Sequence, residues 1–513
     1  MPLLLYAGVV LVILGSIVYL RFSRRGHLPP GPPPKLWSGN VHQLPTGEPW
    51  LTYARWSQTY GPLVFYRVYS RKALVLNSFK SALDLLESSR SSIYSDRPMA
   101  WMYKELIGRK LAVFNISVKH PRFKKYRKLL QTGLNPRATQ SYRTTQEAQA
   151  RILVQGLATA PEQFIYQIRR YAGGVILEVT YGWTVSKKND FFVSLMEKAL
   201  VTHANITKPG RWWVDSYPIL GFVPAWFPFA EFKREAAATF RGLFSNVEST
   251  PHEWAKKQME SGHYVESFTS IHMRPESGVP PDTEEEDIIK WCSSALYAGG
   301  ADTVVGVLTG FILQMVLCPE VQKRAQSELD RIVGNRLPNI DDLSNLSFVS
   351  ALLKEVLRWA SVSPLGLPHR LTKDDTYSGY FIPKDTTVYA NNWYFPNGIP
   401  RALCFRPGSL HPKEDVEPQL DPRRYVFGFG RRVCPGAHFA EVTAFLAITY
   451  ILSVFNISEA LDEHGEEIEP KIEFTTAVTS HVKPFECRIA VRNLDLLAAA
   501  ADKTDDSSQG SHR

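Results

Sequence analysis

The chain has 513 residues, of which 44% are apolar and 21% are charged, an ordinary globular balance with enough apolar material for a large core. Its net charge of +9 is modest for this length and includes no long lysine or arginine tract, which argues against nucleic-acid binding. The five cysteines are scattered and odd in number, which argues against a disulfide framework and suits a reducing compartment.

The N-terminal segment has the pattern of a membrane anchor. Residues 2–20 are almost entirely apolar and uncharged, and at helical rise they span roughly 28 Å, about one hydrocarbon core. Three arginines follow within 21–25, which places the rest of the chain on the cytosolic face. A cleaved signal peptide is the alternative, but no positive charge begins the run and no small-residue cleavage site precedes the arginines. We expect a transmembrane anchor over 1–20 and, because 27–34 is proline-rich and stiff, a basic and proline-rich hinge over 21–44.

Hydrophobic periodicity predicts the elements that follow. The clearest are a helix near Trp50–Tyr60, strands at Leu63–Val68 and Ala73–Leu76, a helix around Ser78–Ser88, a basic helix over Lys119–Leu130, a long helix over Asp287–Cys318, a helix over Asn345–Ala360, a strand pair with a turn at Gly379–Pro383 and Thr387–Tyr389, and an apolar helix over Ala437–Val454. After Asn493 the composition shifts to Ala, Asp, Ser, Gln and Gly, so residues 496–513 are expected to be a disordered tail.

The long helix contains the run A-G-G-A-D-T at residues 298–303. Glycines inside a helix cost stability and usually mark a close approach or a local distortion, so by itself the run is more often a helix-packing site. An acid followed by a threonine, Asp302 and Thr303, is also what oxygen chemistry uses, because the acid relays protons and the hydroxyl hydrogen-bonds the oxygen.

Glu355 and Arg358 stand three residues apart on the next predicted helix. In isolation such a pair is usually a surface pair worth on the order of a few tenths of a kcal/mol. The residues alone therefore favour a solvated ion pair at this position.

One cysteine stands in a loop of glycines and arginines, Phe427 to Gly436, which reads F-G-F-G-R-R-V-C-P-G and precedes an apolar helix. Glycines here allow tight turns and close approach of the backbone to a flat ligand. Backbone N–H groups and the start of a helix stabilise a thiolate, which is a candidate axial ligand of a haem iron. Arg432 is placed to meet a propionate. The alternatives are an inert buried cysteine in a glycine-rich turn and a zinc site, although no second cysteine or histidine stands at ligand spacing.

The pattern F-x-x-G-x-R-x-C-x-G is matched in full and strongly resembles the haem-binding loop of the cytochrome P450 family. The run at 298–303 stands roughly 130 residues before the cysteine, and the E-x-x-R pair stands about 75 residues before it, in the order and spacing of that family. The resemblance covers about Pro29 to Arg492. It implies a mainly α fold with a small β-portion, the cytochrome P450 fold, with a haem-thiolate catalytic domain over 45–495 behind an N-terminal transmembrane helix.

The resemblance also implies a role for each matching residue. Cys434 would ligate the iron of haem b, and Thr303 and Asp302 would handle oxygen and protons. Arg127, which stands in a W-x-x-x-R pattern with Phe123 in place of the tryptophan, would hold the propionates together with Arg370 and Arg432. The remaining implied residues are Phe427, Gly430 and Gly436 in the haem loop, and Glu355 and Arg358 as a buried structural pair.

By family likeness the reaction is monooxygenation, in which one oxygen atom from dioxygen enters an apolar small molecule. Electrons would come from NADPH through NADPH-cytochrome P450 reductase, with cytochrome b5 as a second donor, on the endoplasmic reticulum membrane. Six of the ten residues in 119–128 are basic, either as a solvated helix face or as a docking patch for an acidic donor. Tryptophans and prolines at 212–228 resemble the family's lid near the membrane surface, where they suit either a bilayer interface or a hydrophobic flap over the substrate channel. The sequence of this stretch is similar to that of a fungal branch near the O-methylsterigmatocystin oxidoreductases, which suggests secondary or xenobiotic metabolism.

Residues 395–411 depart from the family. The F-x-P element survives as Phe405 and Pro407, but Gly408 and Ser409 stand where a glutamate and an arginine are expected, as a frameshift or mis-spliced exon would produce. One alternative is therefore a haem-deficient or inactive membrane protein. The other is a haem-thiolate isomerase or peroxygenase that needs no reductase, against which the Asp302-Thr303 pair argues. The sequence carries no readable code for the substrate.

Overall fold

A computed structural model of the chain describes residues 26–186, 189–276, 278–395, 419–476 and 479–509. The predicted anchor over 1–20 lies outside these ranges, as does the altered region 395–411 except for Phe395. Every candidate site residue lies inside them.

Helices dominate the described residues. In chain order they are α2 (Pro49–Tyr60), α3 (Phe79–Ala82), α4 (Ser91–Tyr94), α5 (Pro121–Leu134), α6 (Pro136–Ser141), α7 (Arg143–Thr159), α8 (Phe164–Tyr181), α9 (Phe191–Ile206), α10 (Trp213–Ser216), α11 (Glu231–Glu235), α12 (Arg241–Ser261), α13 (Phe268–Met273), α14 (Thr283–Leu317), α15 (Pro319–Ile332), α16 (Ser347–Trp359), α18 (Ala437–Val454) and α19 (Leu494–Gln509). The strands are β1 (Leu63–Val68), β2 (Arg71–Leu76), β3 (His369–Arg370), β4 (Asp375–Tyr377), β5 (Tyr380–Ile382), β6 (Thr387–Ala390), β7 (Phe455–Leu461), β8 (Glu467–Ile468) and β9 (Cys487–Val491).

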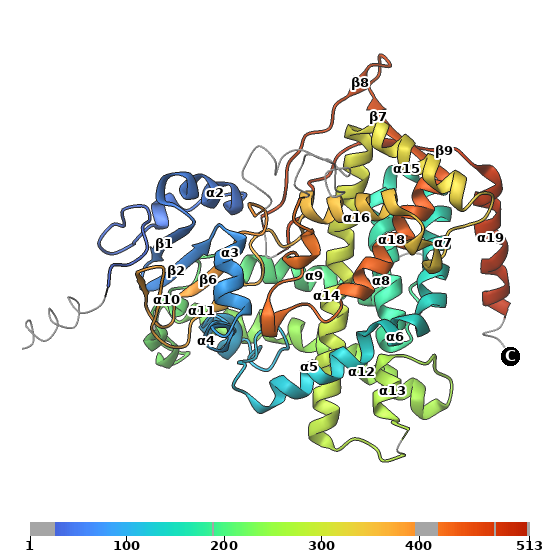
Figure 1. The fold of residues 1–513 in the computed structure, drawn as a ribbon. Helices are drawn as coiled ribbons and strands as arrows, with labels where there is room; N and C mark the ends of the chain where they lie inside the picture. Colours follow the sequence, from blue (N-terminus) through green and yellow to red (C-terminus); the bar gives the residue numbers. More distant parts are fainter. Residues whose placement is uncertain (1–25, 187–188, 277, 396–418, 477–478, 510–513) are drawn as a thin grey trace, which may run out of the picture.

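The elements separate into two sides. Figure 1 shows the sheet of β1, β2 and β6 on the left and the large helices α7, α8, α14 and α18 on the right. Within the described ranges the strands form a four-stranded sheet in the order β1-β2-β6-β3, a two-stranded sheet β4-β5 and a three-stranded sheet β8-β7-β9. A mainly helical fold with a small β-portion is therefore confirmed.

Helix α14 is the central element of the helical side. It begins at Thr283, earlier than the predicted Asp287, because Asp282 and Glu285 form a capping box at its start. It packs closely on α8, and Gly300 permits this contact, since a Cβ at that position would lie 2.5 Å from Ile176 Cγ1. Helices α14 and α18 are long and apolar enough to cross a membrane, but in each case 78% of the apolar window is buried in the fold. We therefore assign both helices to the core.

The predicted pairing of the strands at Gly379–Pro383 and Thr387–Tyr389 is wrong. Strand β5 pairs with β4 instead, and Ser378 and Gly379 both adopt positive φ (50° and 80°), which gives the tight two-residue turn of a hairpin. Strand β6 runs parallel to β2 and antiparallel to β3. The two predicted strands therefore exist but belong to different sheets.

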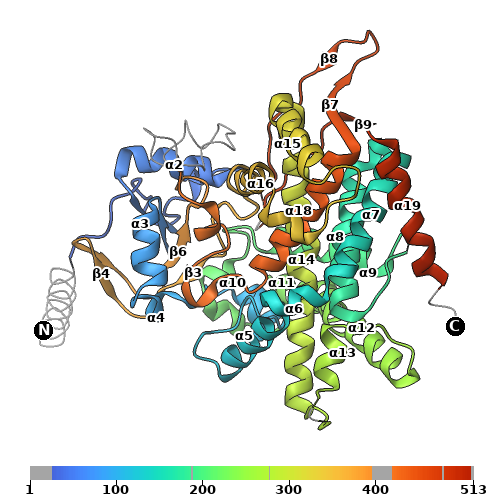
Figure 2. The same ribbon diagram turned by 45° about the vertical axis from the view of Figure 1, so that its right-hand side comes forward.

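The C-terminal segment was expected to be disordered from residue 496, and this expectation is corrected. Helix α19 forms instead and lies beside α7 in both ribbon views (Figures 1 and 2). Asn493 Oδ1 accepts a hydrogen bond from the backbone N–H of Leu496 (3.0 Å), and Gln155 Nε2 donates to the carbonyl of Ala500 (2.8 Å). Leu496 and Ala500 are buried, so an apolar stripe and a cap outweigh the polar composition.

Leu496→Ala is expected to loosen α19. Leu496 is 3% exposed, and replacing a buried leucine with alanine costs roughly 2–5 kcal/mol, so amide protection in the helix should fall by about tenfold or more. Hydrogen exchange over 494–501 measures this effect. Leu494→Ala is the matched control, since Leu494 is 74% exposed and its loss should change little. Equally fast exchange in the unmodified chain and both variants would restore the disordered tail.

Candidate functional site

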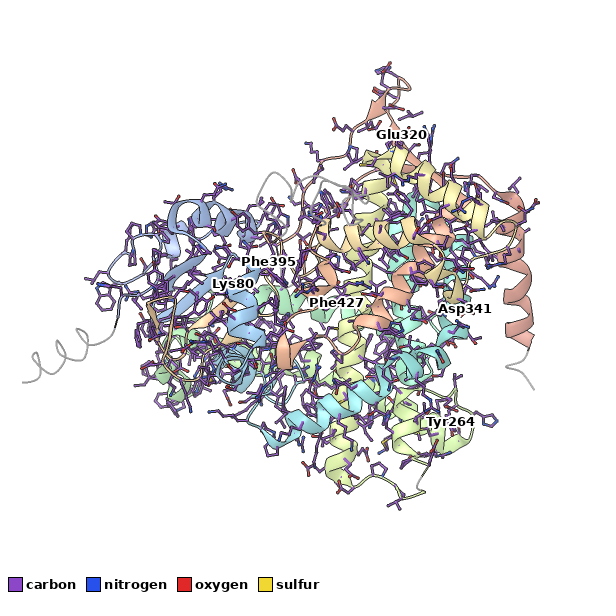
Figure 3. The ribbon with its side chains drawn as sticks, in the orientation of Figure 1. Lys80, Tyr264, Glu320, Asp341, Phe395 and Phe427 are labelled. Carbon is purple, nitrogen blue, oxygen red and sulfur yellow. The ribbon has the colours of Figure 1, made fainter. Side chains whose placement is uncertain are left out.

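The cysteine loop lies between the two sides of the molecule and is fixed by its own backbone. Cys434 N donates to the carbonyl of Phe427 (2.8 Å), which closes the loop just before α18. Gly430 has a φ of 51°, and a Cβ there would lie 2.4 Å from the carbonyl oxygen of Leu86. Only glycine allows this approach. Figure 3 labels Phe427 and Phe395 at the junction between the sheet side and the helical side.

Cys434 is an exposed residue of the loop, yet the surrounding protein desolvates its thiol. Burial raises the pKa of the Cys434 thiol, while a hydrogen bond from the Gly436 N–H and the charge of Arg127 act in the opposite direction. Arg127 on α5 is held close by its bond from Nη1 to the carbonyl of Val433 (2.7 Å). A cysteine must lose its proton to bind a metal, and these two groups favour the thiolate.

Arg432 joins the loop to two other segments. Its Nε donates to the carbonyl of Ser95 (2.9 Å), and its Nη2 donates to the carbonyl of Ile116. The guanidinium lies over the ring of Phe123, 4.5 Å from the centroid. The phenylalanine in the tryptophan position therefore packs against the arginine by a cation–π contact.

Two residues that the sequence analysis did not single out complete this arrangement. Arg97 is 7% exposed and donates to the carbonyls of Phe114 (3.1 Å), Leu367 (2.8 Å) and Pro368 (2.8 Å). His369, the neighbour of the predicted Arg370, is buried and its Nδ1 lies 3.0 Å from the carbonyl oxygen of Tyr94.

The electrostatics of this region suit an anion. Burial lowers the pKa of Arg97 and of Arg432, and the charges of Arg97 and Arg127 lower the pKa of Arg432 further, while Asp96 acts in the opposite direction. Burial and nearby arginines lower the pKa of Lys104 to about 8, and burial with Arg97 and Arg432 lowers that of His369 to about 3. Guanidinium groups stay charged at neutral pH, and among the described residues neither Arg97, Arg127 nor Arg432 forms an ion pair with a carboxylate. Buried positive charge of this kind fits a ligand with two carboxylates.

Arg370 differs from the other arginines. Its Nη2 pairs with Asp96 (2.5 Å) and its Nη1 pairs with Asp385 (3.0 Å). Two carboxylates thus already occupy the guanidinium. Its role with a propionate stays a prediction.

The acid and the alcohol of α14 make separate contacts. Thr303 Oγ1 donates to the carbonyl of Gly299 one turn earlier (2.7 Å). Asp302 Oδ2 accepts from Thr479 Oγ1 (2.6 Å) and from His481 Nε2 (3.0 Å). Burial alone would raise the pKa of Asp302, but these two donors and the charge of Arg169 outweigh it and lower the pKa. Asp302 is therefore ionised at neutral pH.

Glu355 and Arg358 form a fully buried bidentate pair, with both N–O distances at 2.8 Å and side chains that are 0% and 1% exposed. The buried arrangement implied by the family likeness is the one observed, and the surface pair favoured by spacing alone is wrong. The region expected to supply a third partner falls in residues 396–418, outside the described ranges.

A metal site of the zinc type gains no support. No group of three or more His, Cys, Asp or Glu residues that could hold a metal ion occurs in the described part of the chain. The donor set around Cys434 is a single sulfur with backbone N–H groups and cations, which suits a haem iron whose remaining ligands come from the porphyrin.

Comparison with known proteins agrees with this geometry. The family model described as cytochrome P450 matches residues 29–487. The cytochrome P450 monooxygenase claR of Ampulloclitocybe clavipes is 40% identical over 491 residues, covering 94% of this chain and 89% of that protein. Cytochrome P450 monooxygenase 208 of Postia placenta is 37% identical over 508 residues, covering 97% of each chain. Tryptamine 4-monooxygenase of Psilocybe cyanescens is 34% identical over 509 residues, covering 96% of this chain and 99% of that protein.

Proposed function

The chain belongs to the cytochrome P450 family, and from that premise we propose that it is a haem-thiolate monooxygenase acting on an apolar small molecule. The observation that carries the proposal is Cys434 in its loop near Arg97, Arg127 and Arg432, three cations that form no ion pair with a carboxylate among the described residues. When bound, the haem would supply activation of dioxygen and transfer of one oxygen atom.

The residues present fit haem b. Cys434 would hold the iron, with its thiolate stabilised by the Gly436 N–H and by Arg127. Arg97 and Arg432 would hold the propionates, with His369 beside them. Anionic groups at this point would neutralise a buried positive field that otherwise costs stability.

The pocket lining supports an apolar substrate. Phe114, which is expected to belong to the pocket wall, is 41% exposed, and its Cζ lies 3.7 Å from where a Cβ of Gly299 would be. Leu367, which is also expected to line the pocket, is half-buried. Aromatic and aliphatic side chains of this kind favour an apolar ligand with few polar contacts.

Thr303→Ala is expected to leave haem binding intact and to divert reducing equivalents to hydrogen peroxide. Thr303 follows Asp302 directly, and its hydroxyl can exchange its hydrogen bond to Gly299 for one to a ligand in the pocket. Removing a side chain that takes part in proton transfer typically lowers the rate of that step by about 10²–10⁴-fold. The measurement is peroxide released per NADPH consumed with a reductase. Thr309→Ala, which removes a buried hydroxyl on the same helix that donates to Val305 (2.8 Å), is the control. Equal peroxide yields in both variants would exclude the role.

Electrons would come from NADPH through NADPH-cytochrome P450 reductase, with cytochrome b5 as a second donor. Lys124 and Lys128 on α5 are exposed and line, with Arg127, a surface hollow of about 500 Å³. Arg122 and Lys125 on the same helix are instead paired with acids at the start of α14. An acidic donor surface complements the cations that remain.

The enzyme would sit on the endoplasmic reticulum membrane with its catalytic domain in the cytosol. Supporting this, an exposed apolar surface gathers on the sheet side: Leu36, Trp37, Trp213, Ile219, Phe222, Trp226 and Phe229. The lid contacts the β1–β2 turn through the tilted rings of Trp213 and Tyr69, whose centroids are 5.2 Å apart, and through the hydrogen bond from Ser70 Oγ to the carbonyl of Ser216. Aromatic side chains of this kind favour a bilayer interface.

The deciding experiment is the carbon monoxide difference spectrum of the reduced, membrane-expressed protein. A red-shifted Soret band is expected, because thiolate ligation by Cys434 shifts it. A band at shorter wavelength would mean haem without a thiolate, and no band would mean that haem is not retained. Either result would refute the proposed function.

A further inference from the structure

Asp302 is anchored by a turn near the C-terminal end of the chain. Besides the bonds from Thr479 and His481, the turn is itself fixed, because Ser480 N donates to the carbonyl of Val362 (2.8 Å) and Thr475 N donates to the carbonyl of His481 (2.8 Å). The carboxylate of α14 is therefore held by a segment about 180 residues further along the chain.

The His481 side chain packs against α14 at Asp302 and Gly306. Its side chain is 16% exposed, and Gly306, one turn after Asp302, leaves room for the ring, since a Cβ there would lie 3.4 Å from His481 Nδ1. Nδ1 is buried without a hydrogen-bond partner among the described residues. Because an ionised carboxylate only accepts, the hydrogen belongs on Nε2, where it points at Asp302.

The other charged and titratable groups facing Asp302 come from three helices. Arg169 on α8, Glu197 on α9 and Tyr297 on α14 line, with Asp302, a cavity of about 20 Å³, which has room for one water molecule. Arg169 and Glu197 form an ion pair (3.4 Å) whose side chains are partly exposed. Asp302 thus has a route toward solvent on one face and His481 on the other.

We propose that His481 is a positioning residue for proton delivery. The His481 Nε2–H fixes the orientation of the Asp302 carboxylate beside the small cavity, so that Asp302 exchanges a proton with bulk solvent through water in that cavity. Only O–H bonds break and form in this transfer, and no further reactant is needed. The proposal rests on the proposed function for its place in the reaction, whereas the His481–Asp302 bond is independent of it.

The test uses the full-length, membrane-expressed protein and the infrared band of the Asp302 carboxyl group, identified by its loss in Asp302→Asn. His481→Leu removes the donor, so burial should raise the pKa of Asp302, and the titration midpoint should move up by about one pH unit or more. His481→Gln keeps an N–H of similar reach and should stay close to the unmodified protein. The acid limb of NADPH-driven oxygen consumption with a reductase should move up by the same amount in His481→Leu only.

An unchanged midpoint in His481→Leu would overturn the proposal, and so would equal shifts in the Leu and Gln variants. If His481→Leu does not fold, Thr479→Val removes the 2.6 Å donor and leaves His481 in place, and it must raise the midpoint by a smaller amount. The carbon monoxide spectrum of each variant separates the two proposals. If the unmodified protein lacks the thiolate band, the proposed function fails, while the infrared titration of Asp302 still tests the bond.

Discussion

Cys434→Ala is expected to abolish the thiolate-type carbon monoxide spectrum while the chain still inserts into membranes. Cys434 supplies the thiol of the cysteine loop, and the Gly436 N–H and Arg127 favour its thiolate form. Alanine has no atom that could bind iron in its place. Activity with a reductase should fall to the background level. The measurement is the reduced carbon monoxide spectrum at equal protein content.

Cys318→Ala is the matched control for this change. Cys318 stands at the end of α14, where burial raises the pKa of its thiol, and its backbone N–H donates to Gln314. Its removal should leave the spectrum unchanged. A red-shifted band that persists in Cys434→Ala would disprove the assignment of the iron ligand.

Glu355→Ala is expected to cost about 3–5 kcal/mol in the free energy of unfolding, because it leaves the Arg358 guanidinium buried without its bidentate carboxylate. Because α16 packs between α14, α15 and α18, this loss should also reduce haem retention. Denaturant unfolding of the detergent-solubilised protein measures the change, and the haem content reports its effect on the site.

Glu320→Ala tests whether burial is the cause. Glu320, labelled in Figure 3, pairs with Lys323 at the same i,i+3 spacing and the same 2.8 Å distance, but the side chains are 82% and 68% exposed. Its loss should change the free energy of unfolding by no more than about 0.5 kcal/mol. Similar small changes in both variants would show that the Glu355 pair contributes no more than a surface pair.

Hydrophobic periodicity predicted the bounds of several helices and strands well. The strand Leu63–Val68 has the predicted bounds, and α14 differs mainly at its start, where the Asp282 cap lengthens it. The partners of these strands were predicted wrongly, because pairing depends on a turn with positive φ at Ser378 that periodicity does not record. The tail was predicted to be disordered because its polar composition gives no sign that Leu496 is buried.

The site was only partly predictable for a different reason. The cysteine loop is a continuous motif, so Cys434 and Arg432 could be named from ten residues of sequence. Arg97 and His369 come from segments 272 residues apart and gain meaning only where the fold joins them. The sequence could not show that the Arg370 guanidinium already pairs with the carboxylates of Asp96 and Asp385.

The position of α19 has a practical consequence. The helix lies at the edge of the helical side in Figures 1 and 2, whereas α10, which carries Trp213 of the exposed apolar surface, lies on the sheet side. A protein fused behind α19 would be attached on the side of the molecule away from Trp213. An affinity tag or a covalently attached reductase at the C-terminus should therefore be compatible with immobilisation of the enzyme on lipid nanodiscs.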